Sequence, residues 1–146
     1  MAATDLAQVL AIAECLPEAP QWPESAYLNA IDSKSTPRRI ALVATGLQAG
    51  SILGFTVASL LPPLAELETI AVTAKNQRQG LGRRLFLALA VELRAAGANE
   101  LHLEARPSNQ PALALYRSLG FVQSGLRPGY YADPIEDAIL MHLPLS

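Results

Sequence analysis

The fold is decided by the stretch LETIAVTAKNQRQGLGRRLFLALAVELRAAG, which covers residues 67–97. Its apolar start, residues 67–72, predicts a β-strand, and a polar loop with Gly80 and Gly82 follows. A long apolar helix pattern then begins without a spacer. The start of a helix leaves about four backbone N–H groups without partners, and the aligned peptide dipoles add about half a positive charge there. The stretch therefore predicts an anion-binding loop of the kind that holds phosphates.

Four cations surround this loop, and no acid occurs between Glu68 and Glu92. The cations are Lys75, Arg78, Arg83 and Arg84. Cations in the first turn of a helix oppose its dipole, so Arg83 and Arg84 do not stabilise the helix. A bound polyanion would give them a function. The alternative is a set of solvated cations beside an ordinary strand-to-helix turn, and the stretch alone leaves it open.

The whole chain has the composition of one folded domain, residues 1–146. Of its 146 residues, 51% are hydrophobic and 16% are charged, which excludes a disordered or fibrous chain. The length suffices for one domain with a substantial core. The net charge of −2 argues against a general nucleic-acid binder, which would carry a basic excess. The single cysteine, Cys15, excludes an intramolecular disulfide and suits a reducing compartment. No spacing of His, Cys and carboxylates indicates a metal site.

Neither an export signal nor a membrane span is predicted. Residues 1–16 carry Asp5 and Glu14 and lack the positive start and uninterrupted apolar run of a secretory signal. The longest uncharged stretch, residues 40–65, is broken by three glycines and two prolines, so it is typical of strands and turns. We therefore expect a soluble, cytoplasmic protein without a membrane partner.

Turn residues and hydrophobic periodicity divide the chain into helices and strands in a mixed order. Helices are expected at residues 5–16, 23–31, 81–96 and 111–119. Strands are expected at residues 40–44, 52–61, 65–72, 100–106, 121–127 and 135–143. The last two strands are expected to flank a loop around Gly129, Tyr130 and Tyr131. This order predicts a mixed α/β (α+β) domain with one central sheet.

Aromatic and acidic residues gather near the two ends of the chain. Trp22 and Tyr27 lie in a proline-rich segment, where we interpret them as core anchors, with the lining of a substrate mouth as the alternative. Residues 1–33 and 133–137 together hold eight of the 13 acids. If these segments lie together in space, they would attract a cationic substrate. A solvated acidic surface is an equally good interpretation of the sequence.

Two motifs resemble signatures of the GCN-five-related N-acetyltransferases (GNAT). The run QRQGLG, residues 77–82, resembles the acyl-CoA pyrophosphate signature Q/R-x-x-G-x-G/A. The run from Asn109 to Phe121 resembles the second signature, N-x-x-A-x-x-L-Y-x-x-x-G-F. No G-K-[ST] follows the glycine loop, so a nucleotide-hydrolase phosphate loop is excluded.

Within this family, residues 65–145 resemble the RimI type, which acetylates the N-terminal alanine of a small-subunit ribosomal protein. The resemblance rests on segments that share residue type and spacing with that type. These are IAV (70–72), QRQGLGR (77–83), LEAR (103–106), SNQPALALY (108–116) and EDAILMHLP (136–144). It implies the GNAT fold, a mostly antiparallel sheet flanked by helices. It also implies acetyl-CoA as acetyl donor and a protein with a free N-terminus, a ribosomal protein, as acceptor.

The resemblance also implies which residues carry the chemistry. Glu104 corresponds to the base that deprotonates the amine, and Tyr116 to the acid that protonates the departing coenzyme A sulfur. Tyr130 and Tyr131 correspond to contacts of the acceptor peptide. The residues implied to bind acetyl-CoA are Ile70, Ala71 and Val72 through their backbone, with Arg78, Gln79, Gly80, Leu81, Gly82, Arg83 and Asn109.

Each of these side chains has a purely structural alternative. Strand alternation places Glu104 on the face opposite Leu101 and Leu103, where it could be an ordinary solvent-facing carboxylate. Tyr116 could be a core tyrosine of the helix, and Asn109 a helix cap. An α-amine with a pKa of about 8 is largely protonated near neutrality, so a base would help the reaction.

Two other functions remain open from the sequence. The same fold could acetylate a small-molecule amine, since residues 1–64 match the family only loosely. A non-catalytic acyl-CoA-binding module is the third possibility, which retention of Glu104 and Tyr116 disfavours. RimI-type chains usually carry an F-P-W-S-like run after the first helix, whereas this chain has PQWPE at residues 20–24. Peptide specificity is therefore less firmly implied than catalysis.

Overall fold

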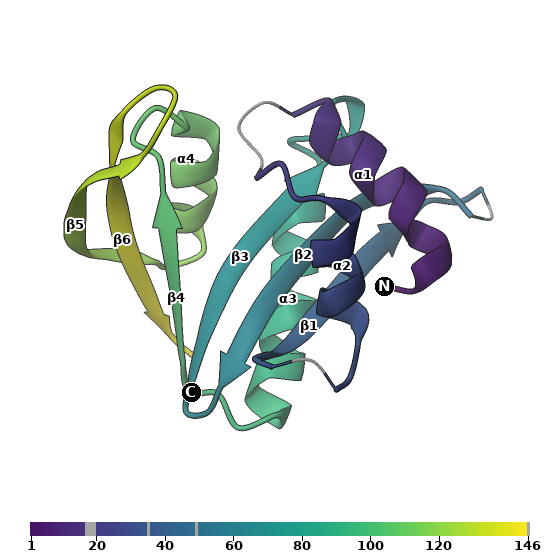
Figure 1. Cartoon of the computed structure of the whole chain (residues 1–146), viewed down its shortest axis with the longest axis horizontal. Coiled ribbons are helices and arrows are strands. Elements are labelled where there is room, and N and C mark those ends of the chain that lie inside the picture. The colour runs from purple at the N-terminus through teal and green to yellow at the C-terminus, as the bar shows by residue number, and fades with distance from the viewer. Residues whose placement is uncertain (17–19, 35, 49, 146) are drawn as a thin grey trace.

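The computed structural model describes residues 1–16, 20–34, 36–48 and 50–145, which form a six-stranded sheet flanked by helices (Figure 1). This confirms the expected mixed α/β class. Glu18, one of the acids of the N-terminal segment, lies outside the described residues. The helices are α1 (Leu6–Glu14), α2 (Glu24–Ile31), α3 (Leu81–Ala95) and α4 (Gln110–Ser118), with 3₁₀ turns η1 (Ala3–Asp5) and η2 (Ala74–Asn76). The strands are β1 (Arg38–Thr45), β2 (Ile52–Leu61), β3 (Leu64–Val72), β4 (Glu100–Ala105), β5 (Val122–Tyr131) and β6 (Glu136–Pro144).

The sheet is mostly antiparallel, in the order β1-β2-β3-β4-β6-β5. The first three strands form a meander, because short turns join β1 to β2 and β2 to β3. The last three strands pair as β4 with β6 and β6 with β5, both antiparallel. The parallel pairing of β3 with β4 joins the two groups. No helix in the described part of the chain is long and apolar enough to span a membrane.

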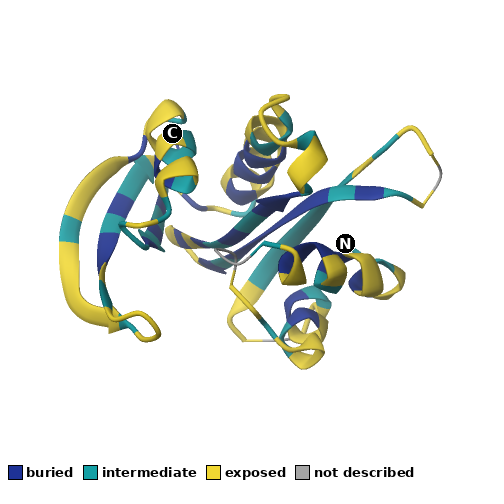
Figure 2. Cartoon of the chain, turned by 90° about the horizontal axis from the view of Figure 1, so that it is seen from above, coloured by how far each residue is buried: buried dark blue, intermediate teal, exposed yellow. Residues whose placement is uncertain are grey.

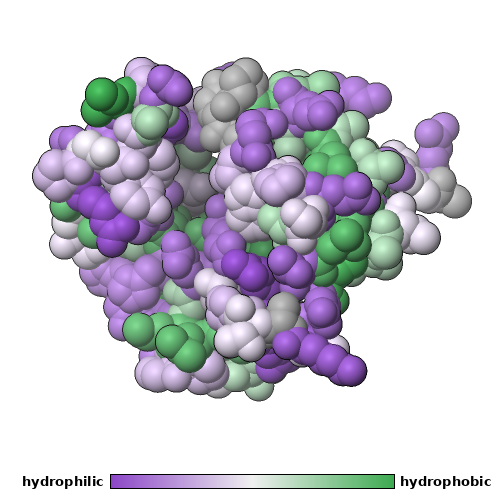
Figure 3. Space-filling model, in the orientation of Figure 1, coloured by the Kyte–Doolittle hydropathy of each residue, from purple (hydrophilic) through white to green (hydrophobic). Residues whose placement is uncertain are grey.

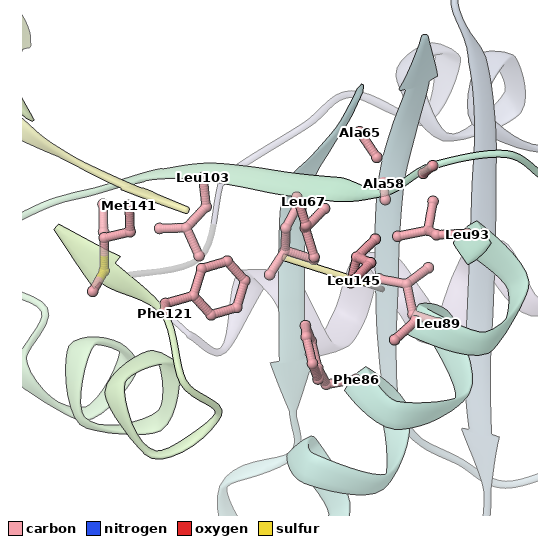
Figure 4. Close-up of a cluster of buried hydrophobic side chains, with 14 of the residues drawn as sticks. Ala58, Ala65, Leu67, Phe86, Leu89, Leu93, Leu103, Phe121, Met141 and Leu145 are labelled. Carbon is pink, nitrogen blue, oxygen red and sulfur yellow. The ribbon is translucent and has the colours of Figure 1, made fainter. Parts of the chain in front are cut away.

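Helices cover both faces of the β1–β3 meander (Figures 1 and 2). On one face, α3 buries Phe86, Leu89 and Leu93 in a cluster with strand residues such as Ala58 and Leu67 (Figure 4). The same cluster continues to Leu103 on β4, Met141 on β6 and Phe121, so one core joins both groups of strands.

On the other face, α1 and α2 bury a smaller cluster against β2 and β3. Tyr27 is fully buried there and packs on Phe55 with ring centroids 5.9 Å apart. Trp22 packs on Tyr27 at 5.2 Å. These contacts support the interpretation of both aromatic residues as core anchors.

A β-bulge in β3 decides where the two groups of strands separate. Val57 pairs with Thr69 and Ala58 with Leu67, so Glu68 has no partner on β2. Bulges of this kind bend the strand that carries them. On its other side, β3 pairs with β4 over three residues only, with Leu64–Glu66 opposite Glu100–His102. Farther along, the two strands diverge (Figure 1).

One expected boundary is wrong. All others agree with the structure to within two residues, but the strand expected at residues 121–127 continues to Tyr131 as β5. Tyr130 and Tyr131 therefore belong to this strand and not to the loop that follows. The reason is an irregularity in which Gly129 adopts a positive φ of 60°, after which the chain rejoins the ladder with Tyr131 opposite Glu136.

Candidate active site

The glycine loop places unbonded backbone N–H groups at the start of α3. Gly80 is the residue before the helix and has a left-handed φ of +78°, which glycine adopts without steric cost. The first helical bond is donated by Arg84 N–H to Gly80 O at 3.1 Å. The N–H groups of Leu81, Gly82 and Arg83 precede this bond, as in any helix start. The side chains of Arg78 and Gln79 are exposed beside them.

This loop lies next to the end of β3 and to α4. A Cβ added to Gly82 would lie 3.5 Å from the Leu115 side chain and 3.9 Å from Val72. Arg83 donates to the carbonyl oxygen of Ser118 at 3.4 Å, which links α3 to the end of α4. The turn η2 separates strand from loop, so the succession of strand, loop and helix is less direct than the sequence predicts. A helix start with unbonded N–H groups is the kind of structure that can bind an anion.

Ile70, Ala71 and Val72 form the end of β3, beyond the bulge. Their partners on β2 are Thr56, Phe55 and Gly54. A Cβ added to Gly54 would lie only 2.7 Å from Ala71 O, so glycine permits this close approach of β2 and β3. No described residue of β4 pairs with these three, because the strands have separated. The edge of β3 that faces β4 is therefore available for a ligand.

Glu104 lies on β4, opposite the face that carries the buried Leu101 and Leu103, as strand alternation predicts. Its side chain is 22% exposed and pairs with Arg127 Nη1 of β5 at 3.2 Å. It is therefore not a freely solvated carboxylate. Sequence analysis missed Arg127, because its pairing depends on how β5 is aligned beside β6.

Tyr130 and Tyr131 join this carboxylate from the end of β5. A hydrogen bond with Glu104 is the main cause that raises the pKa of Tyr130. Burial, together with the charge of Glu104, raises the pKa of Tyr131 to about 12. The two rings meet edge to face at 5.0 Å. Arg127 lies 4.9 Å over the ring of Tyr130, in cation–π range.

Arg106 fixes the loop between β5 and β6. It donates to Glu136 at 2.9 Å and to the carbonyl oxygens of Pro134 at 3.1 Å and Ala132 at 3.0 Å. Its guanidinium also lies 4.4 Å over the ring of Tyr131. Hydrogen bonds from Arg106 and then Ser108 hold the pKa of Glu136 below its usual value. Arg106 follows Glu104 by two residues, directly after the end of β4, a position that could have included it among the candidates.

Tyr116 lies on α4, with its ring edge to face against Phe121 at 5.8 Å. Burial raises its pKa to about 12, and the nearby Tyr131 adds to the shift. The phenol is therefore protonated at neutral pH. Asn109 is the N-cap of α4, since its Oδ1 accepts a hydrogen bond from Ala112 N–H at 3.3 Å. Asn109 therefore caps α4, as the structural alternative for this residue predicts.

Two acids of the C-terminal acidic segment are bonded to neighbouring elements of the same region. Glu136 is held by Arg106, and Asp137 accepts from Gly129 N–H at 2.9 Å. A different acidic cluster lies on β3 and β4. Burial raises the pKa of Glu66, and the charges of Glu104 and Glu68 raise it further, so these three carboxylates are within electrostatic range.

The candidate residues thus form two groups beside the separation of β3 from β4. The anion-binding loop belongs to α3, and the carboxylate and phenols belong to β4, α4 and β5. The molecular surface is hollowed between the β4–β6 part and the β1–β3 part on the face seen in Figure 3. Among the described residues, no three His, Cys, Asp or Glu side chains are grouped so as to hold a metal ion.

Comparisons with known proteins agree with this arrangement. The model of the "Acetyltransferase (GNAT) family" matches residues 7–121. The [ribosomal protein bS18]-alanine N-acetyltransferase of Escherichia coli (strain K12) is 46% identical over 101 residues, 68% of each chain. The crystal structure of the ribosomal-protein-S18-alanine N-acetyltransferase from Escherichia coli has a TM-score of 0.83 at 37% identity, covering 100% of this chain and 91% of that one.

A second solved structure is the Naa20 of Chaetomium thermophilum in complex with a bisubstrate analogue. It has a TM-score of 0.84 at 27% identity, with 99% of this chain and 84% of that chain covered. The family model spans most of the chain, and the sequence and structure comparisons agree with it. The chain therefore belongs to the GNAT family of acetyltransferases.

Proposed function

We propose that this protein transfers the acetyl group of acetyl-CoA to the N-terminal α-amino group of a protein, with an N-terminal alanine of a ribosomal protein as acceptor. The observation that carries the proposal is the meeting of Glu104, Tyr116 and Tyr131 beside the separated β3 and β4. After burial, the charge of Glu104 adds to the rise in the pKa of Tyr131, and Tyr131 adds to the rise in the pKa of Tyr116, so the three groups are within electrostatic range. The name of the Escherichia coli relative supports this choice of acceptor.

The start of α3 is suited to the pyrophosphate of acetyl-CoA. Gly80, Leu81, Gly82 and Arg83 would direct backbone N–H groups to it, with Arg78 and Gln79 beside them. The backbone of Ile70, Ala71 and Val72 would bind the pantetheine arm and polarise the thioester carbonyl. Such fixed donors are often the largest catalytic contribution. Asn109 would contact the donor through its amide N–H₂, because its oxygen caps α4.

Glu104 and Tyr116 then act as base and acid. Glu104 takes a proton from the α-ammonium group, and the free amine attacks the thioester carbonyl carbon. A C–N bond forms, the C–S bond breaks, and the sulfur takes the proton of the Tyr116 phenol. The attacking nitrogen, which would otherwise remain positively charged, releases one proton to solvent, and solvent returns a proton to the phenolate. Tyr130 and Tyr131 line the acceptor side next to Glu104. The carboxylates Glu66 and Glu104 favour a cationic acceptor there.

The acceptor is tested with a panel of amines and acetyl-CoA, read by mass spectrometry. The panel holds peptides of equal length that begin with Ala, Ser, Gly or Met, together with polyamines. We expect acetylation at the α-amine of the peptide that begins with Ala. A matched peptide whose α-amine is already blocked, and which carries a lysine, should remain unmodified. Modification of the polyamines alone would contradict a peptide acceptor.

Replacing Glu104 by glutamine keeps the shape of the side chain and removes its basicity. We expect kcat/KM for the Ala peptide to fall about 10²- to 10⁴-fold, the usual contribution of a positioned base. The Kd of acetyl-CoA, measured by calorimetry, should hardly change. Glu100→Gln makes the same chemical change on the same strand and should retain activity. Wild-type turnover in Glu104→Gln would remove Glu104 from the mechanism.

Replacing Tyr116 by phenylalanine removes the proposed acid and keeps the ring that packs on Phe121. We expect kcat to fall about 10²-fold or more, because the sulfur would leave without its proton donor. Acetyl-CoA affinity should stay close to the wild-type value. Tyr27→Phe, which removes another buried hydroxyl, serves as the control and should leave kcat unchanged. Loss of acetyl-CoA binding in Tyr116→Phe would indicate a structural role instead.

Replacing Gly80 and Gly82 together by alanine should weaken the binding of acetyl-CoA. Alanine at Gly80 is strained by the left-handed φ of +78°, at a cost of about 1–2 kcal/mol. The methyl group at Gly82 would lie 3.5 Å from the Leu115 side chain and 3.9 Å from Val72, beside the unbonded N–H groups of the helix start. We expect Kd to rise about tenfold or more, the equivalent of about 1.4 kcal/mol.

Gly97→Ala is the matched control for the loop variant. It has a φ of +99° near the other end of α3, so it introduces similar strain away from the loop. It should lower thermal stability and leave the Kd of acetyl-CoA unchanged. Unchanged affinity in the double glycine variant would show that the pyrophosphate binds elsewhere.

A further inference from the structure

Glu104 is held by two partners from β5, although β4 and β5 are not neighbours in the sheet. Arg127 Nη1 lies 3.2 Å from Glu104 Oε1, and interaction with the same carboxylate is the main cause that raises the pKa of Tyr130. Arg127 also lies over the ring of Tyr130. The three side chains therefore restrain one another. Within the ion pair, the side chain of Glu104 is 22% exposed and that of Arg127 is 54% exposed, so Glu104 is the more buried member.

A regular strand could not bring Arg127 and Tyr130 to the same carboxylate. Side chains three residues apart on a strand point to opposite faces, because successive side chains alternate. In β5, however, Arg127 pairs with Ala138 and Tyr131 pairs with Glu136. Residues 128–130 therefore oppose a single residue of β6. The two extra residues leave Arg127 and Tyr131 on one face of the sheet, and Tyr130 lies inside the bulge, where regular alternation does not apply.

The bulge is fixed by its own hydrogen bond. Gly129 adopts a φ of +60°, and its N–H donates to Asp137 Oδ1 at 2.9 Å. Asp137 is the residue of β6 that stands opposite the bulge. Bulges next to active sites commonly redirect a side chain. Here the redirected side chain is that of Tyr130, since Arg127 precedes the bulge.

We propose that Arg127 is a positioning residue that holds the carboxylate of Glu104 in one orientation for the acceptor amine. The proposal rests on the proposed function of Glu104 as the base. A glutamate side chain on a sheet surface samples several rotamers, and a base is effective only within hydrogen-bond reach of its proton. The guanidinium restrains one carboxylate oxygen, so the incoming amine meets a carboxylate that is already oriented. Arg127 itself is half exposed and need not touch the acceptor.

Arg39 offers a matched control within the same sheet. It pairs with Glu68 at 2.9 Å, also between a strand arginine and a strand glutamate, and it lies on β1. Removing this pair tests the general effect of losing such an ion pair on the sheet. Neither of its members is paired with Glu104.

The test is a double-mutant cycle of Arg127→Met with Glu104→Gln, read as kcat/KM on the Ala peptide. We expect Arg127→Met to lower kcat/KM about tenfold in the wild-type background, less than the roughly 10²-fold that a misplacement of 1 Å costs. In the Glu104→Gln background it should change the residual rate by less than about twofold, because Arg127 acts through Glu104. Arg127→Lys should recover most of the loss, and Arg39→Met should show none.

The outcomes separate this inference from the proposed function. An equal loss from Arg127→Met in both backgrounds would show a structural or direct role and overturn the positioning of Glu104 by Arg127. A neutral Arg127→Met, with Glu104→Gln inactive, would overturn it as well and leave the proposed function intact. Full activity of Glu104→Gln alone would overturn the role of Glu104 as base. Acetyl-CoA binding, measured for every variant, should be unchanged.

Discussion

β3 and β4 pair over only three residues each, Leu64–Glu66 with Glu100–His102, and the position of the whole candidate site depends on this short pairing. Parallel strands that paired over their full length would satisfy the backbone groups of Ile70–Val72 and leave no edge for a ligand. The bulge at Glu68 and the shared core under both groups of strands make the separation stable. The two groups of strands remain packed together despite the separation, because Phe86, Leu103 and Phe121 belong to one buried cluster beneath it.

The charges on the two sides of the separation differ in sign. The start of α3 carries Arg78, Arg83 and Arg84, which suits an anionic acetyl donor. The face of β3 and β4 carries Glu66 and Glu104, which suits a cationic amine. Opposite charges on the two ligands would let each be attracted to its own side. The dipole of α3 opposes the arginines at its start, and a bound pyrophosphate would remove this conflict.

Local rules predicted the elements well, because glycine, proline and the alternation of apolar residues mark their ends. Alternation alone placed Glu104 opposite Leu101 and Leu103, as the structure has it. The bulges at Glu68 and at residues 128–130 could not be predicted, since a bulge exists only relative to the partner strand. Arg127 and Glu104 are 23 residues apart, and Arg106 and Glu136 are 30 apart. Such pairs follow from strand register, which a single sequence does not reveal.

The burial of Tyr116 bears on how it could serve as an acid. Burial raises its pKa to about 12, so the phenol keeps its proton at any physiological pH, but a weaker acid gives up that proton less readily. The leaving sulfur would depart into the same partly buried surroundings, where desolvation would also raise its pKa above the ordinary thiol value of about 8.5. Desolvation therefore raises the proton affinity of donor and acceptor together. The difference between them, which governs the proton transfer, changes much less than either value alone, so a partly buried tyrosine with a raised pKa remains a competent proton donor for this step.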